Sequence, residues 1–268
     1  MSGRGPSTGG APSTDKPEGV ARDVAVGVGG GIVGGMAADL AQGLDRLGLA
    51  LGAGQQAQLL AYLGLIQKWN QVYNLTALRR PDEMFSHHLM DSLAVVAPLC
   101  RQLGITPGDS AIALASVPGA RPLRLLDVGS GAGLPGVVLA ICCPGLAVDC
   151  VDTVAKKAAF IQQVAAQLQL GKLRGVHERV ERLSGPYDLI CSRAFASLAD
   201  FVNWSGQALA EEGVWMAMKG KHPSEEIAAL PAHVGVFHVE PLQVPGLAAE
   251  RCLVWLRKGL AAADTTPA

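Results

Sequence analysis

The second half of the chain alternates short apolar runs rich in β-branched residues with helical patterns. Strand, helix and strand at this spacing predict a parallel sheet with helices on both faces. Two further apolar runs, separated by Pro241 and Pro245, predict a closing antiparallel pair, which gives a mostly parallel seven-stranded α/β sheet. The expected strands are 123–128, 146–151, 173–180, 187–191, 214–218, 234–239 and 252–256, and the expected intervening helices are 135–142, 154–169 and 197–210.

The chain before this core has a different pattern. Apolar residues at three- and four-residue steps predict a helix that ends near Asn70 to Asn74, and a second helix is expected to start at Pro81 and Asp82. Gly and Pro are so dense before residue 37 that ordering this part would cost too much chain entropy. The predicted organisation is a flexible extension (1–36), a helical segment (37–103), an inserted loop (104–121), the core (122–258) and a flexible tail (259–268).

Composition excludes several classes of protein. With 49% hydrophobic and 17% charged residues, the 268-residue chain can bury a core, so wholesale disorder is excluded. The formal charge of −1 excludes a polycation that coats nucleic acid, so any RNA binding must use a local patch. The six cysteines show no C-x-x-C spacing, which argues against a zinc ribbon or a disulfide framework. A reduced, cytoplasmic compartment is therefore expected. The apolar stretch 25–38 is too short and too glycine-rich to span a membrane.

A glycine turn follows the first strand of the core. Gly129, Gly131 and Gly133 allow positive φ angles and let a ligand approach the main chain, while Pro135 suits the first turn of the next helix. A cofactor is therefore expected here. The pattern alone does not identify it, because Gly131 to Gly136 also satisfies the dinucleotide fingerprint G-x-G-x-x-G.

Two carboxylates narrow the choice of cofactor. Asp127, at the end of the first strand, would repel a pyrophosphate but attract the sulfonium and ammonium groups of S-adenosylmethionine. Asp152 ends the second strand, where a carboxylate can accept hydrogen bonds from both ribose hydroxyls of either cofactor. Each residue also has a purely structural interpretation, Asp127 as a cap of the turn and Asp152 as a helix cap.

Several short motifs follow one another along the chain. They are Trp69-Asn70, Asn74-Leu75-Thr76-Ala77, His88-Leu89-Met90-Asp91-Ser92, Leu126 to Gly136, Lys156-Lys157, Arg179-Val180-Glu181, Ser192 to Leu198, and Met218-Lys219-Gly220-Lys221. In these motifs and their order, the sequence closely resembles the bacterial small-subunit ribosomal RNA guanine-N7 methyltransferases, also called the glucose-inhibited division protein B family. The resemblance runs from about residue 55 to residue 258; the glycine-rich extension and the inserted loop are not part of the family pattern.

The resemblance implies a Rossmann-like class I methyltransferase that transfers a methyl group from S-adenosylmethionine to N7 of one guanine in the 530-loop region of 16S ribosomal RNA. It places the cofactor against Gly129 and Leu134, the adenine beside Val180 and Glu181, and Arg193 within the cofactor site. We expect Ser130 and Gly131, in the same turn, to contact the cofactor as well.

Guanine N7 is an unprotonated lone pair, so the reaction needs no general base, and no catalytic residue or metal is expected. The protein has to hold N7, the methyl carbon and the sulfur in line. Candidate substrate-binding residues are Asn70, Lys219 and the pair His88 and Asp91, which stand three apart on one helical face. Structural roles compete for each of them, and helix capping is the better interpretation of Asn74.

Other functions stay open at this stage. They are a methyltransferase acting on another RNA, a small molecule or a protein, a nicotinamide oxidoreductase supported only by the overlapping glycine pattern, and a non-catalytic RNA-binding module. The expected partner is 16S ribosomal RNA or the 30S subunit, the expected state is a monomer, and no membrane association is expected.

Overall fold

The computed structural model describes residues 30–108 and 121–259, and every structural statement below concerns these residues. Seven strands form one sheet in the order β3-β2-β1-β4-β5-β7-β6, and only β7 runs antiparallel to its neighbours. The prediction of a Rossmann-like, mostly parallel sheet is confirmed. The strands are β1 Arg124–Val128, β2 Ala147–Asp152, β3 Leu173–His177, β4 Tyr187–Arg193, β5 Leu209–Lys219, β6 Val234–Pro241 and β7 Cys252–Lys258.

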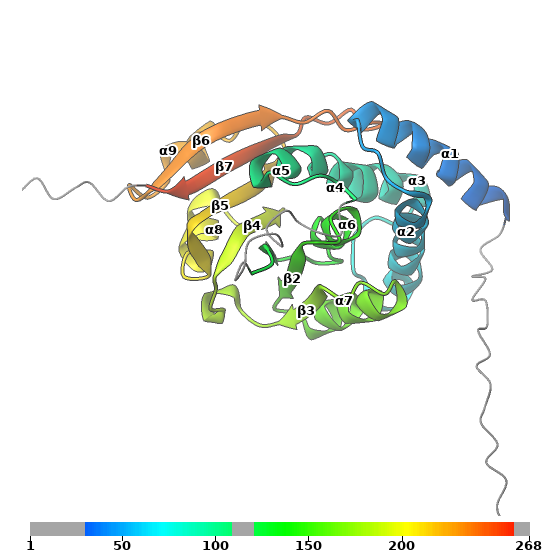
Figure 1. The fold of residues 1–268 in the computed structure, drawn as a ribbon, viewed down its shortest axis with the longest axis horizontal. Helices are drawn as coiled ribbons and strands as arrows, with labels where there is room; N and C mark the ends of the chain where they lie inside the picture. The colour runs from blue at the N-terminus through cyan, green and yellow to red at the C-terminus, as the bar shows by residue number, and fades with distance from the viewer. Residues whose placement is uncertain (1–29, 109–120, 260–268) are drawn as a thin grey trace, which may run out of the picture.

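Helices cover both faces of the sheet (Figure 1). The larger core joins one face to the N-terminal helices, α6 and α7, whereas the smaller core joins the opposite face to α8 and α9. The N-terminal helices therefore form part of the same folded body as the sheet. The helices are α1 Gly30–Leu47, α2 Ala53–Tyr73, α3 Pro81–Met84, α4 Asp91–Leu93, α5 Val96–Leu103, α6 Gly136–Cys142, α7 Ala155–Gln167, α8 Leu198–Ser205 and α9 Ser224–Ala228.

Helix α1 corrects the predicted end of the flexible extension. It begins at Gly30, so residues 30–36, which the sequence assigned to the extension, are helical. Leu40 and Leu44, one turn apart, are buried in the larger core, and Met36 is partly buried against the same core. The packed turns stabilise the helix, and the preceding glycine-rich turn extends it, since adding a residue to an existing helix costs less than starting one. Most of the predicted inserted loop, 109–120, lies outside the described residues.

Two predicted boundaries in the core were wrong. Strand β3 ends at His177, which pairs with Asp152, the last residue of β2. Beyond that pair β3 has no partner strand, so Val180 to Arg182 form a 3-10 turn instead. Strand β5 begins at Leu209, which the sequence placed in a helix, because pairing with Tyr187 of β4 outweighs the local helical pattern.

The helix predicted from Pro81 starts there but does not continue as one α-helix. Phe85–Met90 form a π-helical turn between α3 and α4. Such turns add a residue to the helix and rotate the side chains that follow, and they are common at functional sites. This turn contains His88 and leads directly into Asp91.

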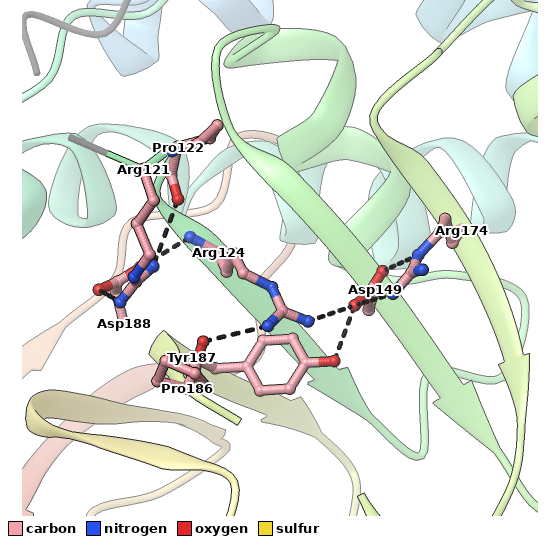
Figure 2. A network of polar contacts seen from close by, with 8 residues as sticks. All are labelled: Arg121, Pro122, Arg124, Asp149, Arg174, Pro186, Tyr187 and Asp188. Carbon is pink, nitrogen blue, oxygen red and sulfur yellow. Dashed lines mark hydrogen bonds and ion pairs between the residues drawn. The ribbon is translucent and has the colours of Figure 1, made fainter. Parts of the chain in front are cut away.

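A polar network joins four strands near their amino ends (Figure 2). Asp149 of β2 accepts hydrogen bonds from Arg174 of β3 at 2.7 Å, Arg124 of β1 at 3.2 Å and the Tyr187 hydroxyl of β4 at 2.7 Å. Burial alone would raise the pKa of Asp149, but the hydrogen bonds from Arg174 and Tyr187 outweigh it and hold that pKa below its usual range. The amino ends are thus held by ion pairs, which leaves the opposite, carboxyl edge for ligands.

Candidate functional site

The glycine turn lies at the carboxyl edge of the sheet, between β1 and α6. The N–H of Ser130 donates to the carbonyl of Val151 in β2 at 3.1 Å, so the turn spans the ends of β1 and β2. Gly131 has φ +60°, and a Cβ added there would meet nothing within 4 Å. The main chain at Gly131 is therefore open to a ligand. Leu134 is buried below the turn.

Asp152 faces this turn from the end of β2. One carboxylate oxygen accepts from the N–H of Gly131 at 3.0 Å and lies 3.3 Å from the ammonium of Lys157, and the other accepts from the N–H of Val154 at 2.9 Å. Asp152 therefore holds Val154, the N-cap residue of α7, and does not itself cap the helix as its structural interpretation predicted. It is also connected to the open part of the glycine turn. These three contacts leave about one of the four acceptor positions of the carboxylate for a ribose hydroxyl, one fewer than the two expected from the sequence.

Tyr62 of α2 supports the turn from below, a contact that the sequence did not indicate. Its hydroxyl donates to the carbonyl of Ala132 at 2.7 Å and lies 3.1 Å from that of Gly133. The ring is 1% exposed, so these are buried hydrogen bonds. The N-terminal helical segment thereby helps to fix the shape of the cofactor turn.

Asp127 is fully buried beneath the turn. One of its oxygens accepts from the N–H of Gly136 at 2.8 Å, and burial raises the pKa of Asp127 to about 7. The Cys191 thiol is a weak donor to the Asp127 carboxyl, whose other oxygen has no stronger partner among the described residues, and the hydroxyl of Ser130 finds none there. Buried polar atoms without partners are rare in folded proteins, so both atoms fit a site completed by a polar ligand.

Phe195 covers the opposite side of the turn. A Cβ added to Gly129 would lie 2.6 Å from the Phe195 ring, so the ring rests directly on this glycine. Ala194, just before it, has φ +53°, a backbone conformation that residues other than glycine rarely adopt. The ring lies against the glycine that the resemblance places beside the cofactor.

Val180 and Glu181 lie in the 3-10 turn after β3. Val180 is buried in the smaller core and Glu181 is exposed. Strand β3 is the neighbour of β2, so this turn and Asp152 belong to the same end of the carboxyl edge.

His88 and Asp91 come together through Arg193 at the end of β4. Arg193 donates to the carbonyl of His87 at 2.8 Å and to Asp91 at 3.2 Å, and lies 3.5 Å from Nδ1 of His88. The predicted direct pair between His88 and Asp91 is replaced by contacts that each residue makes with Arg193. The sequence missed Arg251, which donates to the other oxygen of Asp91 at 2.9 Å.

His88 is neutral near pH 7 in this environment. Burial lowers its pKa to about 4, with the positive charge of Arg193 as a second cause. Its Nε2 lies 2.7 Å from the Thr76 hydroxyl. Because Nδ1 faces a guanidinium, which can only donate, we assign Nε2 as the protonated nitrogen that donates to Thr76.

Asn70 and Asn74 organise the loop after α2. The amide of Asn70 donates to the carbonyl of Leu78 at 2.8 Å and accepts from the N–H of Thr76 at 2.9 Å. Asn74 ends α2 with φ 50°, which confirms the capping role expected for it. Both ends of the Asn70 amide contact its own loop, and this arrangement favours the structural role for Asn70 over base recognition.

Lys219 ends β5 and is held by Glu226 of α9, at 3.0 and 2.7 Å from the two carboxylate oxygens. Glu226 also accepts from the N–H of Leu198 at the start of α8. The ammonium is therefore neutralised by one carboxylate. The sequence did not identify Glu226, because the short helix α9 has no apolar pattern.

The described residues offer neither a membrane span nor a cluster of metal ligands. No described helix is both long and apolar enough to cross a membrane. Within the same residues, no group of three or more His, Cys, Asp or Glu side chains could hold a metal ion. The cysteines are buried, and Cys100 and Cys143 place their sulfur atoms 3.6 Å apart.

Comparisons with known proteins cover most of the chain. The family model described as rRNA small subunit methyltransferase G matches residues 55–103 and 108–254. The protein named ribosomal RNA small subunit methyltransferase G from Acidovorax sp. (strain JS42) is 64% identical to this chain over 218 residues, which cover 81% of this chain and 93% of that protein. The protein of the same name from Albidiferax ferrireducens is 64% identical over 217 residues, covering 81% of this chain and 94% of that protein.

Proposed function

Because the chain belongs to the rRNA small subunit methyltransferase G family, we propose that it transfers a methyl group from S-adenosylmethionine to N7 of one guanine in the 530-loop region of 16S ribosomal RNA. The proposal includes action in the cytoplasm, as a monomer, on the ribosomal RNA or the 30S subunit. Membership of the family gives the reaction class, and the residues at the carboxyl edge give the way in which this chain would perform it.

The observation that carries the proposal is the contact between Gly131 and Asp152. An open stretch of main chain lies 3.0 Å from a strand-end carboxylate, with space beside Gly131. Ligands of open α/β sheets bind at this edge, where a carboxylate can accept from ribose hydroxyls. Asp152 would thus hold the ribose and the turn would lie along the cofactor.

The remaining residues fit the other parts of the same cofactor. Val180 would supply an apolar contact for the adenine, with Glu181 beside it. Asp127 and Ser130 hold buried oxygens with unused hydrogen-bonding capacity under the turn. S-adenosylmethionine, when bound, supplies a methyl group on a positively charged sulfur.

The chain's own task is positioning. N7 of guanine offers its lone pair without losing a proton, so no side chain needs to act as a general base. Alignment of two bound reactants can account for roughly 7 to 11 kcal/mol of a reaction barrier in favourable cases. Arg193, fixed by Asp91 and by the carbonyl of His87, would present its remaining N–H groups to the substrate or the cofactor.

The decisive experiment is nucleoside mass spectrometry of 16S ribosomal RNA from cells with and without the gene. We expect 7-methylguanosine in the 530-loop fragment to disappear on deletion and to return with the intact gene. Retention of the modified nucleoside in the deletion strain would reject the proposed substrate.

A binding titration tests the cofactor separately. S-adenosylhomocysteine should bind the purified protein, and NADH should not compete with it. Competition by NADH would instead favour the oxidoreductase alternative. Light scattering of the purified protein checks the monomer, and a mass of two chains would correct it.

A further inference from the structure

Exposed apolar side chains gather at the C-terminal end of α2. Val72 is 71% exposed and Tyr73 is 40% exposed. Neither fits the usual pattern of a helix end, where polar residues face water. These two consecutive apolar side chains leave apolar surface open to a partner.

The ring of Tyr73 is supported by a stack of aromatic rings. Its centroid lies 5.1 Å from that of Trp69, with 32° between the ring planes. Trp69 in turn lies 5.4 Å from Phe160 of α7, which is fully buried. The exposed ring is therefore anchored to the core, and holding it for a partner costs little additional side-chain entropy.

This surface lies at the same edge as the cofactor turn. Gln58, near the start of α2, donates to the carbonyl of Leu168 at the end of α7, whereas Trp69 meets Phe160 nearer the start of α7. These two contacts run in opposite directions along the two helices, so the helices are antiparallel neighbours. The end of α2 that carries Tyr73 therefore reaches toward the start of α7, which follows Asp152 by a few residues.

Positive charge accompanies the exposed ring. Arg79 donates to the carbonyl of Asn70 at 2.9 Å and to the side-chain oxygen of Asn74 at 2.6 Å. Both acceptors are neutral, so these contacts fix the guanidinium beside Tyr73 without neutralising its charge. Asp82, the acidic residue closest in sequence, is paired with Arg80 at 2.7 Å.

We propose that this surface, formed by Tyr73, Val72 and Arg79, binds a single-stranded segment of the substrate RNA, with an unpaired base stacked on Tyr73 and a phosphate at Arg79. Tyr73 is eleven residues beyond Tyr62, so it lies about 16 Å further along the helix axis than the contact with the glycine turn. The stacked base is then a few nucleotides from the methylated guanine. Single-stranded RNA fits because its unstacked bases bind exposed aromatic rings and its phosphates bind arginine.

The experiment compares Tyr73→Ala and Tyr73→Phe with a matched control. Phe237→Ala removes a ring of similar exposure, 38%, from β6, the outermost strand on the side of the sheet opposite β3. For each protein we would measure KM for unmethylated 30S subunits and Kd for S-adenosylhomocysteine. Loss of one base stack should raise KM about five- to hundredfold in Tyr73→Ala, while Tyr73→Phe and Phe237→Ala stay close to the wild-type protein.

The cofactor titration separates docking from folding. Kd for S-adenosylhomocysteine should be unchanged in Tyr73→Ala, since the ring lies outside the glycine turn. The inference is overturned if Tyr73→Ala keeps the wild-type KM, if Tyr73→Phe is equally impaired, or if cofactor affinity and KM change together. It rests on the proposed function, and the wild-type protein distinguishes the two failures: no methyl transfer to any 30S preparation rejects both, whereas transfer with an unaltered KM in Tyr73→Ala rejects only this surface.

Discussion

Arg193 donates to Asp91 at 3.2 Å, and this contact joins the end of β4 to the N-terminal helical segment across 102 residues of sequence. Asp91 is 2% exposed, and its other oxygen accepts from Arg251, just before β7. One buried carboxylate thus faces two guanidinium groups, while the neighbouring His88 is neutral. The cluster keeps a net positive charge at the carboxyl edge, where an anionic RNA would approach.

Arg251→Met tests whether Arg251 positions Arg193. Without Arg251, Asp91 would draw Arg193 toward itself, so the Arg193 N–H groups would no longer face the site. We expect kcat/KM for methyl transfer to fall about tenfold, the equivalent of one charge-assisted hydrogen bond, with partial recovery in Arg251→Lys. Arg101→Met, which removes the exposed ion pair with Glu240, should leave the rate unchanged. Equal rates in Arg251→Met and Arg101→Met would show that Arg251 has no positioning role.

This cluster shows where sequence reasoning is limited. His88, Asp91 and Arg193 were each identified from motifs, but the pairing expected from helical spacing was His88 with Asp91. The π-helical turn at Phe85–Met90 changes the directions of the side chains, and no sequence pattern predicted this turn. Arg251 lies in a loop just before β7, and its role depends on a contact between distant segments, which periodicity cannot reveal.

The sheet was more accessible to prediction. Buried parallel strands are nearly continuous apolar runs, so the strands around the glycine turn were located within a few residues. Errors arose where a partner strand decided the boundary. Leu209 is in β5 because Tyr187 pairs with it, and β3 ends at His177 because β2 ends opposite. Tyr62 is similar, since helical periodicity predicted its burial but not the carbonyls that its hydroxyl would meet.

Asp127→Asn should show a characteristic dependence of stability on pH. Burial raises the pKa of Asp127 to about 7 in the folded chain, against about 3.9 when unfolded. Below pH 4 both states hold the proton; between pH 4 and 7 the unfolded state gives it up first, so this group's contribution to folding declines as pH rises. Asn does not titrate, and its oxygen can still accept from Gly136. The melting temperature of Asp127→Asn relative to the wild-type protein should therefore increase from pH 4 to pH 7 and then level off.

The measurement is thermal denaturation of both proteins without cofactor from pH 4 to pH 8. The titration of His88 is common to both proteins and cancels in the difference. A difference in melting temperature that stays constant from pH 4 to pH 8 would mean that Asp127 is ionised in the folded chain throughout.

Tyr62→Phe should weaken both the fold and cofactor binding. It removes the hydroxyl that contacts Ala132 and Gly133 and leaves buried carbonyls without that donor. A loss of about 1 to 3 kcal/mol of stability is expected, together with weaker binding of S-adenosylhomocysteine because the turn is less firmly held. Tyr187→Phe is the control, since it removes a buried hydroxyl from Asp149 at the opposite end of the strands. Calorimetric titration should show reduced affinity only for Tyr62→Phe; an equal reduction in both variants would mean that general loosening, and not support of the turn, is responsible.

Gly131→Ala tests whether the space beside the turn is occupied by the cofactor. In the free protein the new methyl group meets nothing within 4 Å, so only the positive φ strains the backbone, at a cost of about 1 to 2 kcal/mol. Gly48→Ala supplies a matched strain, with φ +65° and equally open surroundings at the end of α1. The melting temperature should fall by a similar amount in both variants. Kd for S-adenosylhomocysteine should rise at least about tenfold in Gly131→Ala alone, because a methyl group would stand where the ligand approaches the main chain. Unchanged affinity in Gly131→Ala would place the cofactor elsewhere on the carboxyl edge.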